Sequence, residues 1–194
     1  LIRLAINLGF SAGPAIGGLI IMHLNYSGLF WVDGITCILA TLVLLIVLHP
    51  KKAKIQDEIK IEKPESAYKD TPFLIFFMAM ILFAIVFFQY FSVMPIYYRE
   101  THELTELQIG LLLGGNGLFI FLFEMPLIKW LERTKNTKVS LILFGAFLVG
   151  LSLIVLNITH WSGILIIGML LMTIGEMIAF PFAHGFALDR AKRG

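Results

Sequence analysis

The sequence has few charged residues and almost no cysteine. Charged side chains make up 14% of the chain, against about 25% in soluble domains, so a water-soluble globular domain is not expected. Cys37 is the single cysteine, which excludes an internal disulfide and a metal site built on cysteine. The five histidines are scattered without ligand spacing, and we predict no bound metal.

The chain also lacks the patterns that indicate an enzyme. It contains no Ser-His-Asp order, no glycine-rich phosphate loop and no His/Glu metal spacing. We therefore predict a protein that is not an enzyme and that needs no cofactor. The net charge of +2 is too small to indicate nucleic-acid binding.

Apolar sequence takes the place of these missing features. The chain is 58% hydrophobic, with a mean hydropathy of +0.88. Six stretches are close to the length of about 20 apolar residues that crosses a bilayer as a helix. They are Leu4–Met22, Phe30–Leu48, a span within Pro72–Tyr98, Leu107–Ile128, Val139–Ile158 and Trp161–Leu188. Because these runs do not alternate as strands do, we predict an all-α, polytopic membrane bundle with six transmembrane helices.

A hydrophilic linker over residues 49–72 sets the predicted orientation. It is rich in lysine, and Lys and Arg concentrate in cytoplasmic loops. With the linker in the cytoplasm, all but one of the 15 Lys and Arg residues lie on that side, and Arg99 is the exception. We predict an integral protein of the bacterial inner (plasma) membrane with both ends cytoplasmic. Because the sequence starts at Leu1, we also expect it to be an excerpt of a longer chain.

Glycines recur every fourth residue in the first predicted helix, at Gly9, Gly13 and Gly17. This spacing forms a groove where another helix can approach closely. Pro14 removes one backbone hydrogen bond and bends the helix. Two interpretations are open: a static packing surface, or a bend that lets two helical bundles close against each other.

The segment Gly13-Pro14-Ala15-Ile16-Gly17-Gly18 resembles a motif of proton-coupled antiporters in the major facilitator superfamily. In the branch of drug:proton antiporters with twelve helices, the motif reads glycine-proline-x-x-glycine-glycine and lies in the fifth helix. The long basic loop after the next apolar span strengthens the resemblance. It implies that the six spans are helices five to ten of such a transporter.

The resemblance also implies a division of the chain. Residues 1–48 would form the last two helices of an N-terminal bundle, 49–72 a cytoplasmic linker, and 73–194 the first four helices of a C-terminal bundle. The implied function is secondary active transport by alternating access, in which protons drive efflux of a small lipophilic compound. Two alternatives are proton-coupled uptake of a sugar, peptide or organic anion, and a non-transporting membrane sensor or scaffold on the same fold. The expected partners are substrate, protons, the lipid bilayer and the missing helices.

Two carboxylates lie inside the apolar spans, Glu124 and Glu176. A charge at the bilayer centre costs about 2.5–3.5 kcal/mol on insertion scales, so such residues usually face the bundle interior. Glu124 shares one helix face with Gly110, Gly114 and Gly117, which predicts that this face contacts protein. Each carboxylate is a candidate for proton coupling or, alternatively, for a clamp between helices.

Five further polar residues are candidates for a substrate cavity. They are Gln89, Tyr90, Asn116, Asn7 and Arg3. Gln89, Tyr90 and Asn116 can hydrogen-bond a substrate or simply a neighbouring helix. Arg3 is either an anchor at the membrane interface or a cation in the cavity.

Overall fold

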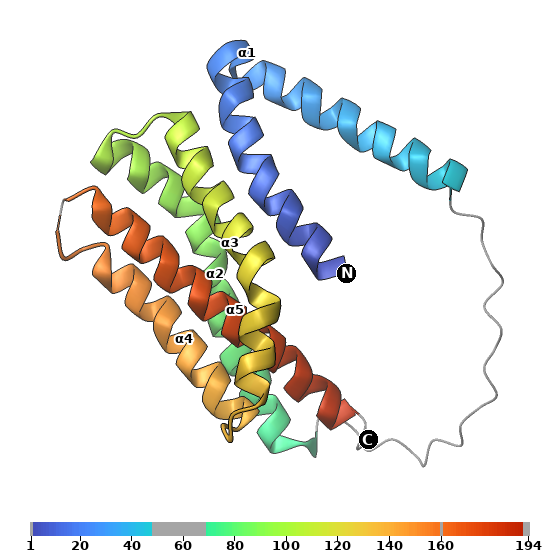
Figure 1. Cartoon of the computed structure of the whole chain (residues 1–194), viewed down its shortest axis with the longest axis vertical. Coiled ribbons are helices and arrows are strands. Elements are labelled where there is room, and N and C mark those ends of the chain that lie inside the picture. The colour runs from blue at the N-terminus through green and yellow to red at the C-terminus, as the bar shows by residue number, and fades with distance from the viewer. Residues whose placement is uncertain (1, 48–68, 160, 192–194) are drawn as a thin grey trace.

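The computed structural model describes residues 2–47, 69–159 and 161–191. It contains five helices: α1 (Ile2–Val47), α2 (Thr71–His102), α3 (Glu106–Glu132), α4 (Lys138–Val155) and α5 (Gly163–Ala191) (Figure 1). No strand occurs among the described residues, and the predicted all-α class is confirmed.

Each of the five helices is long and apolar enough to cross a membrane. The predicted number of six is not confirmed, because α1 contains both of the first two predicted spans. Within α1, Asn25 leaves the helical conformation, with φ 62° and ψ 179°, and the chain bends there into two arms (Figure 1). This combination of positive φ with ψ near 180° is rarely adopted by residues other than glycine. Residues 49–68 of the predicted linker lie outside the described part, and its cytoplasmic placement stays a prediction.

Local side chains explain where three helices begin. The Asp70 carboxylate accepts a hydrogen bond from the Phe73 amide at the start of α2. Thr105 and Gln108 form a reciprocal capping box at the start of α3, and Thr137 caps α4. These caps satisfy amides of the first turn that have no partner within the helix.

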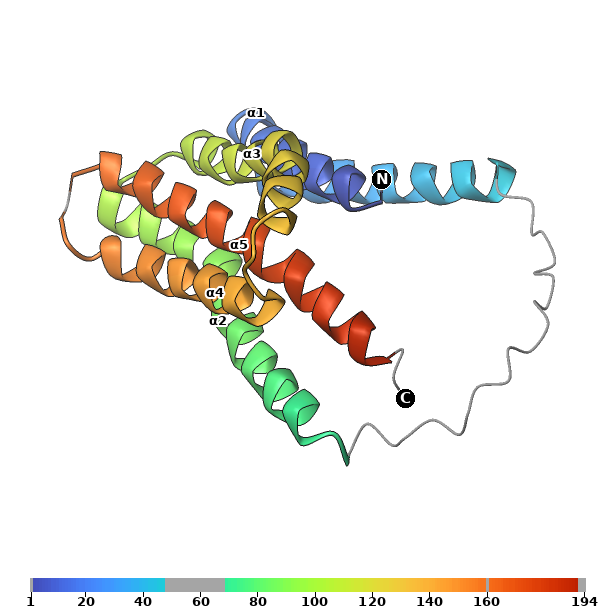
Figure 2. The ribbon, with the colours of Figure 1, turned by 60° about the horizontal axis from the view of Figure 1, so that its bottom comes forward.

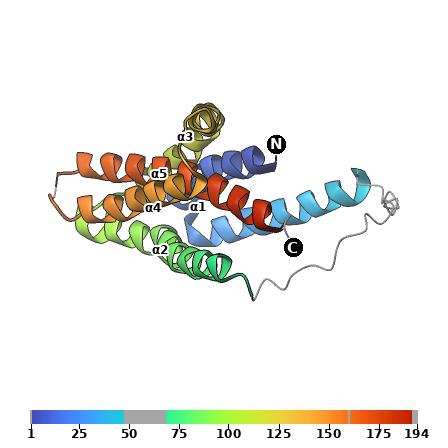
Figure 3. The ribbon, with the colours of Figure 1, turned by 90° about the horizontal axis from the view of Figure 1, so that it is seen from below.

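Helices α2–α5 form one packed body (Figures 2 and 3), and the apolar stretch of α5 has the largest buried share among the five helices. Half of the most apolar stretch of α5, 50%, is buried, against 0% for α1. Helices α4 and α5 meet through glycine. A Cβ on Gly145 would lie 2.7 Å from the Gly175 carbonyl oxygen, and the reverse distance is the same.

Ion pairs join α5 to its neighbours at one end of this body. Lys138 Nζ lies 2.5 Å from Asp189 Oδ2, and Arg190 Nε lies 3.2 Å from Asp70 Oδ2. We name this the inner end, following the predicted orientation. The outer end is the opposite one, where Arg99 lies.

The second arm of α1 runs away from the other helices (Figures 1 and 2). Every residue from 33 to 47 is exposed, and most of them are large and apolar. A continuous apolar surface of this length is not expected in water, and it fits a bilayer environment.

Candidate functional site

The first arm of α1 packs along α3 (Figure 1), and the glycines of α3 make this contact close. A Cβ on Gly114 would lie 2.6 Å from the Ser11 carbonyl oxygen, and one on Gly110 would overlap the Pro14 carbonyl oxygen. Gly117 meets the Ser11 backbone in the same way. All three glycines are buried, which confirms the prediction that this face of α3 contacts protein.

The glycines of α1 take little part in the contact with α3. Gly9 and Gly13 have no described neighbour within 4 Å of a Cβ position, and Gly17 faces the second arm of α1 at 3.5 Å. Gly18 is the exception, since a Cβ there would lie 2.7 Å from the Glu106 carbonyl oxygen. The gating role of the glycine-proline segment therefore stays a prediction, with the Gly9–Gly13 side open to other helices.

Asn7 and Glu124 meet across the α1–α3 interface, nearer its inner end. Asn7 Nδ2 donates a hydrogen bond to Glu124 Oε2 at 3.2 Å, although the two residues are 117 positions apart in the sequence. Glu124 is 0% exposed and Asn7 is 8% exposed. Burying a carboxylate is costly unless it is hydrogen-bonded, so this contact stabilises the carboxylate and joins the helices. Arg3 lies in α1, but its side chain is outside the described part.

A second buried polar contact joins α3 to α5. Asn116 Nδ2 donates to Thr173 Oγ1 at 2.8 Å, and the Thr173 hydroxyl donates to the Met169 carbonyl oxygen at 2.6 Å. Asn116 and Thr173 are 3% and 0% exposed. Of the two roles considered for Asn116, the structure displays the bond between helices.

Glu176 lies in the body formed by α2–α5, on a face of α5 that packs on α2. Met172 and Phe180 lie one turn before and one turn after it, so all three share that face. Met172 belongs to the same buried cluster as Tyr90, and the Phe180 ring lies 4.8 Å from that of Phe87. Glu176 and Glu124 therefore occupy separate places, one within this body and one at the α1–α3 interface.

The other two cavity candidates, Tyr90 and Gln89, lie in different surroundings. Tyr90 is 1% exposed, and its hydroxyl lies 3.3 Å from that of Tyr98. Gln89 is exposed on α2. Sequence reasoning missed Tyr98, because a tyrosine near a helix end usually marks the membrane interface, whereas Tyr98 is 0% exposed.

No group of three or more His, Cys, Asp or Glu residues suited to a metal ion occurs in the part of the chain that the structure describes. The buried polar contacts are instead three pairs: Asn7 with Glu124 at the α1–α3 interface, Asn116 with Thr173 between α3 and α5, and Tyr90 with Tyr98 within α2. Inside an apolar protein, a carboxylate can exchange a proton, and amide and hydroxyl groups can hydrogen-bond a polar substrate.

The family model described as Major Facilitator Superfamily matches residues 1–194. A curated protein of Planococcus maritimus, named "Na(+), Li(+), K(+)/H(+) antiporter", is 30% identical over 132 residues. The match covers 61% of this chain and 31% of that relative, so the chain spans less than a third of the relative's length. No solved structure matches the chain significantly.

Proposed function

The chain belongs to the major facilitator superfamily, and from this we propose that the protein is a secondary transporter that exchanges a small substrate for protons. The family agrees with the resemblance noted for residues 13–18. On this proposal α1 belongs to one helical bundle and α2–α5 to the other, and the two bundles rock about a site near the bilayer midplane.

The observation that carries the proposal is the buried hydrogen bond from Asn7 to Glu124. A charged carboxylate accepts a stronger hydrogen bond than a neutral acid. Proton binding at Glu124 would therefore weaken the contact between α1 and α3, which links the proton to the movement of the bundles. Glu176 is the second proton-coupling candidate, because it lies within the α2–α5 bundle.

We propose export of a small lipophilic compound as the first candidate function. An aromatic cluster supports it: the Phe87 ring lies 5.3 Å from that of Phe91 and 4.8 Å from that of Phe180, and the Phe83 ring lies 5.4 Å from that of Phe180. Exchange of monovalent cations for protons is the second candidate, favoured by the name of the Planococcus maritimus relative.

Transport by the full-length protein in inverted membrane vesicles tests both candidates. A pH-sensitive dye reports proton release after addition of Na⁺, Li⁺, K⁺ or a lipophilic cation. We expect Glu124→Gln to reduce substrate-driven proton flux to the level of vesicles without the protein, because glutamine keeps the shape of the side chain and cannot exchange a proton. Glu132→Gln, an exposed position on the same helix, should keep normal flux.

Three results would change the proposal. Normal coupling in Glu124→Gln would remove Glu124 and leave Glu176→Gln as the next variant. Substrate and protons moving in the same direction would indicate uptake by symport. No flux with any substrate, from protein shown to be folded, would favour a sensor or scaffold.

A further inference from the structure

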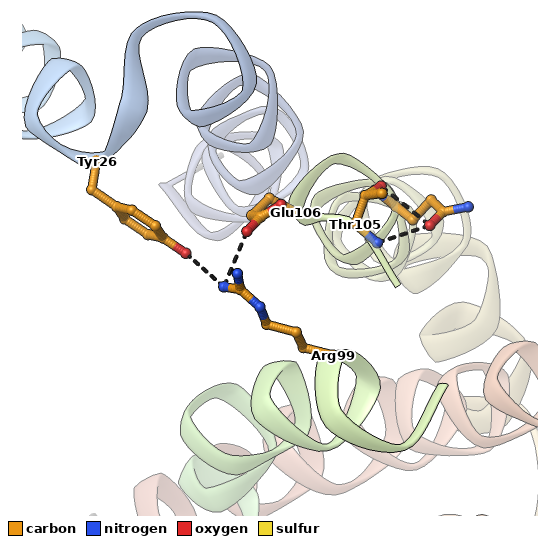
Figure 4. Close-up of polar contacts among 5 residues, drawn as sticks. Tyr26, Arg99, Thr105 and Glu106 are labelled. Atoms are coloured by element: carbon orange, nitrogen blue, oxygen red, sulfur yellow. Dashed lines mark hydrogen bonds and ion pairs between the residues drawn. The ribbon is translucent and has the colours of Figure 1, made fainter. Parts of the chain in front are cut away.

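A polar contact at the outer end brings together side chains from three helices (Figure 4). Arg99 Nη1, near the end of α2, donates to the Tyr26 hydroxyl of α1 at 3.1 Å. The same nitrogen lies 3.0 Å from Glu106 Oε1 at the start of α3. One guanidinium group therefore joins α1 to the helix pair α2–α3.

The local structure fixes two of these three side chains relative to each other. Only residues 103–105 separate α2 from α3, and Glu103 adopts a left-handed conformation with φ 54°. Thr105 N donates to Gln108 Oε1 at 2.9 Å (Figure 4), and Gln108 N donates to Thr105 Oγ1 at 3.3 Å. This capping box holds the first turn of α3, and hence Glu106, in place.

Tyr26 is the member that comes from the other side of the interface. It follows Asn25, the residue at which α1 bends. Close by, Gly18 meets the Glu106 backbone, so α1 and α3 are in direct contact at this level. Because Arg99 and Glu106 belong to α2 and α3, the bond from Arg99 to Tyr26 is the one that would break if α1 moved away.

The contact of Arg99 with Tyr26 and Glu106 is weaker than the buried contact between Asn7 and Glu124. The side chains of Arg99 and Glu106 are 57% and 31% exposed, whereas Glu124 is fully buried. Exposed ion pairs contribute little and are weakened by salt, so the outer contact can open without a large barrier. Arg99 is also the single Lys or Arg that the predicted orientation places outside, and its contacts with Tyr26 and Glu106 explain why a basic residue lies there.

We propose that Tyr26, Arg99 and Glu106 form a latch that holds the outer ends of the two bundles together and opens when the transporter faces outward. The latch rests on the proposed alternating access. Glu106 orients the guanidinium of Arg99, and the Tyr26 hydroxyl accepts the hydrogen bond that crosses between the bundles. In the structure the latch is closed.

Distance measurements between spin labels on the full-length protein in lipid nanodiscs test the latch. Labels on cysteines introduced at Ser27 and Ser162, both exposed, report the separation of α1 from the start of α5. Serine first replaces Cys37 and any cysteine in the rest of the full-length protein. We expect Tyr26→Phe to raise the ratio of open to closed molecules by about two- to fivefold. High salt should have a similar effect on the unsubstituted protein.

The control is Tyr97→Phe, which also deletes one hydroxyl near the end of α2. The Tyr97 hydroxyl donates to the carbonyl oxygen of Leu156, the residue that caps α4, at 3.1 Å. This bond does not involve α1, so its loss should leave the ratio unchanged. An unchanged ratio in Tyr26→Phe, or an equal change in Tyr97→Phe, would overturn the latch. The spin-label measurement does not depend on transport. If the ratio of open to closed molecules responds as expected but no proton exchange is found, only the proposed function is overturned.

Discussion

Replacing Gly114 with alanine should separate α1 from α3. The new Cβ would lie 2.6 Å from the Ser11 carbonyl oxygen and 3.3 Å from the Ala15 Cβ. Favourable contacts between such atoms lie at about 3.5–4.0 Å, so the two backbones must move apart by about 1 Å. Overpacking of this kind costs about 1–3 kcal/mol. The cost arises because both neighbouring atoms belong to, or are fixed by, a helix backbone and cannot rotate away.

The effect can be measured by unfolding the full-length protein, solubilised in a mild detergent, through titration with SDS. We expect Gly114→Ala to lower the free energy of unfolding by about 1–3 kcal/mol. The matched control is Gly115→Ala, because among the described residues a Cβ there would come within 4 Å of Met169 alone, at 3.6 Å from its sulfur. That variant should change stability by less than about 0.5 kcal/mol. Equal stability of the two variants would refute the close contact through Gly114.

Two further predictions use the same titration. Thr173→Val removes the acceptor of the buried Asn116 amide and should lower the free energy of unfolding by about 1–3 kcal/mol. The control Ser92→Ala removes an exposed hydroxyl bonded to its own helix and should lower it little. Similar losses in the two variants would contradict this account. Arg190→Gln breaks the partly exposed ion pair with Asp70 and should lower the free energy of unfolding by less than about 1 kcal/mol. High salt should abolish this difference. A difference that persists at high salt would show that packing, not charge, holds these helix ends together.

Much of the helical layout was predictable from the sequence. The apolar span within Pro72–Tyr98 corresponds to α2, and Leu107–Ile128 corresponds to α3. The spacing of the glycines in α3 also predicted which of its faces is buried. Hydrophobic length and glycine spacing are contained in one continuous segment, so no knowledge of the partner helix was needed.

The partners across the interfaces were not predictable in the same way. The sequence suggested Gly9 and Gly13 as the close-packing side of α1, yet the described contact with α3 passes through Ser11 and Pro14. In a soluble helix the polar side would have indicated the outside. A helix in lipid is apolar on every side, so hydrophobicity does not distinguish the face that meets lipid from the face that meets protein.

The sequence by itself determined that this chain is a set of long apolar helices, where most of them begin and end, and that it resembles one transporter family. Only the tertiary structure decided that Asn7 meets Glu124 and that Arg99 meets Tyr26. The reason is that helix length and capping depend on neighbours within a few positions. A hydrogen bond between distant helices depends on the bend at Asn25 and on how closely glycine lets two backbones approach.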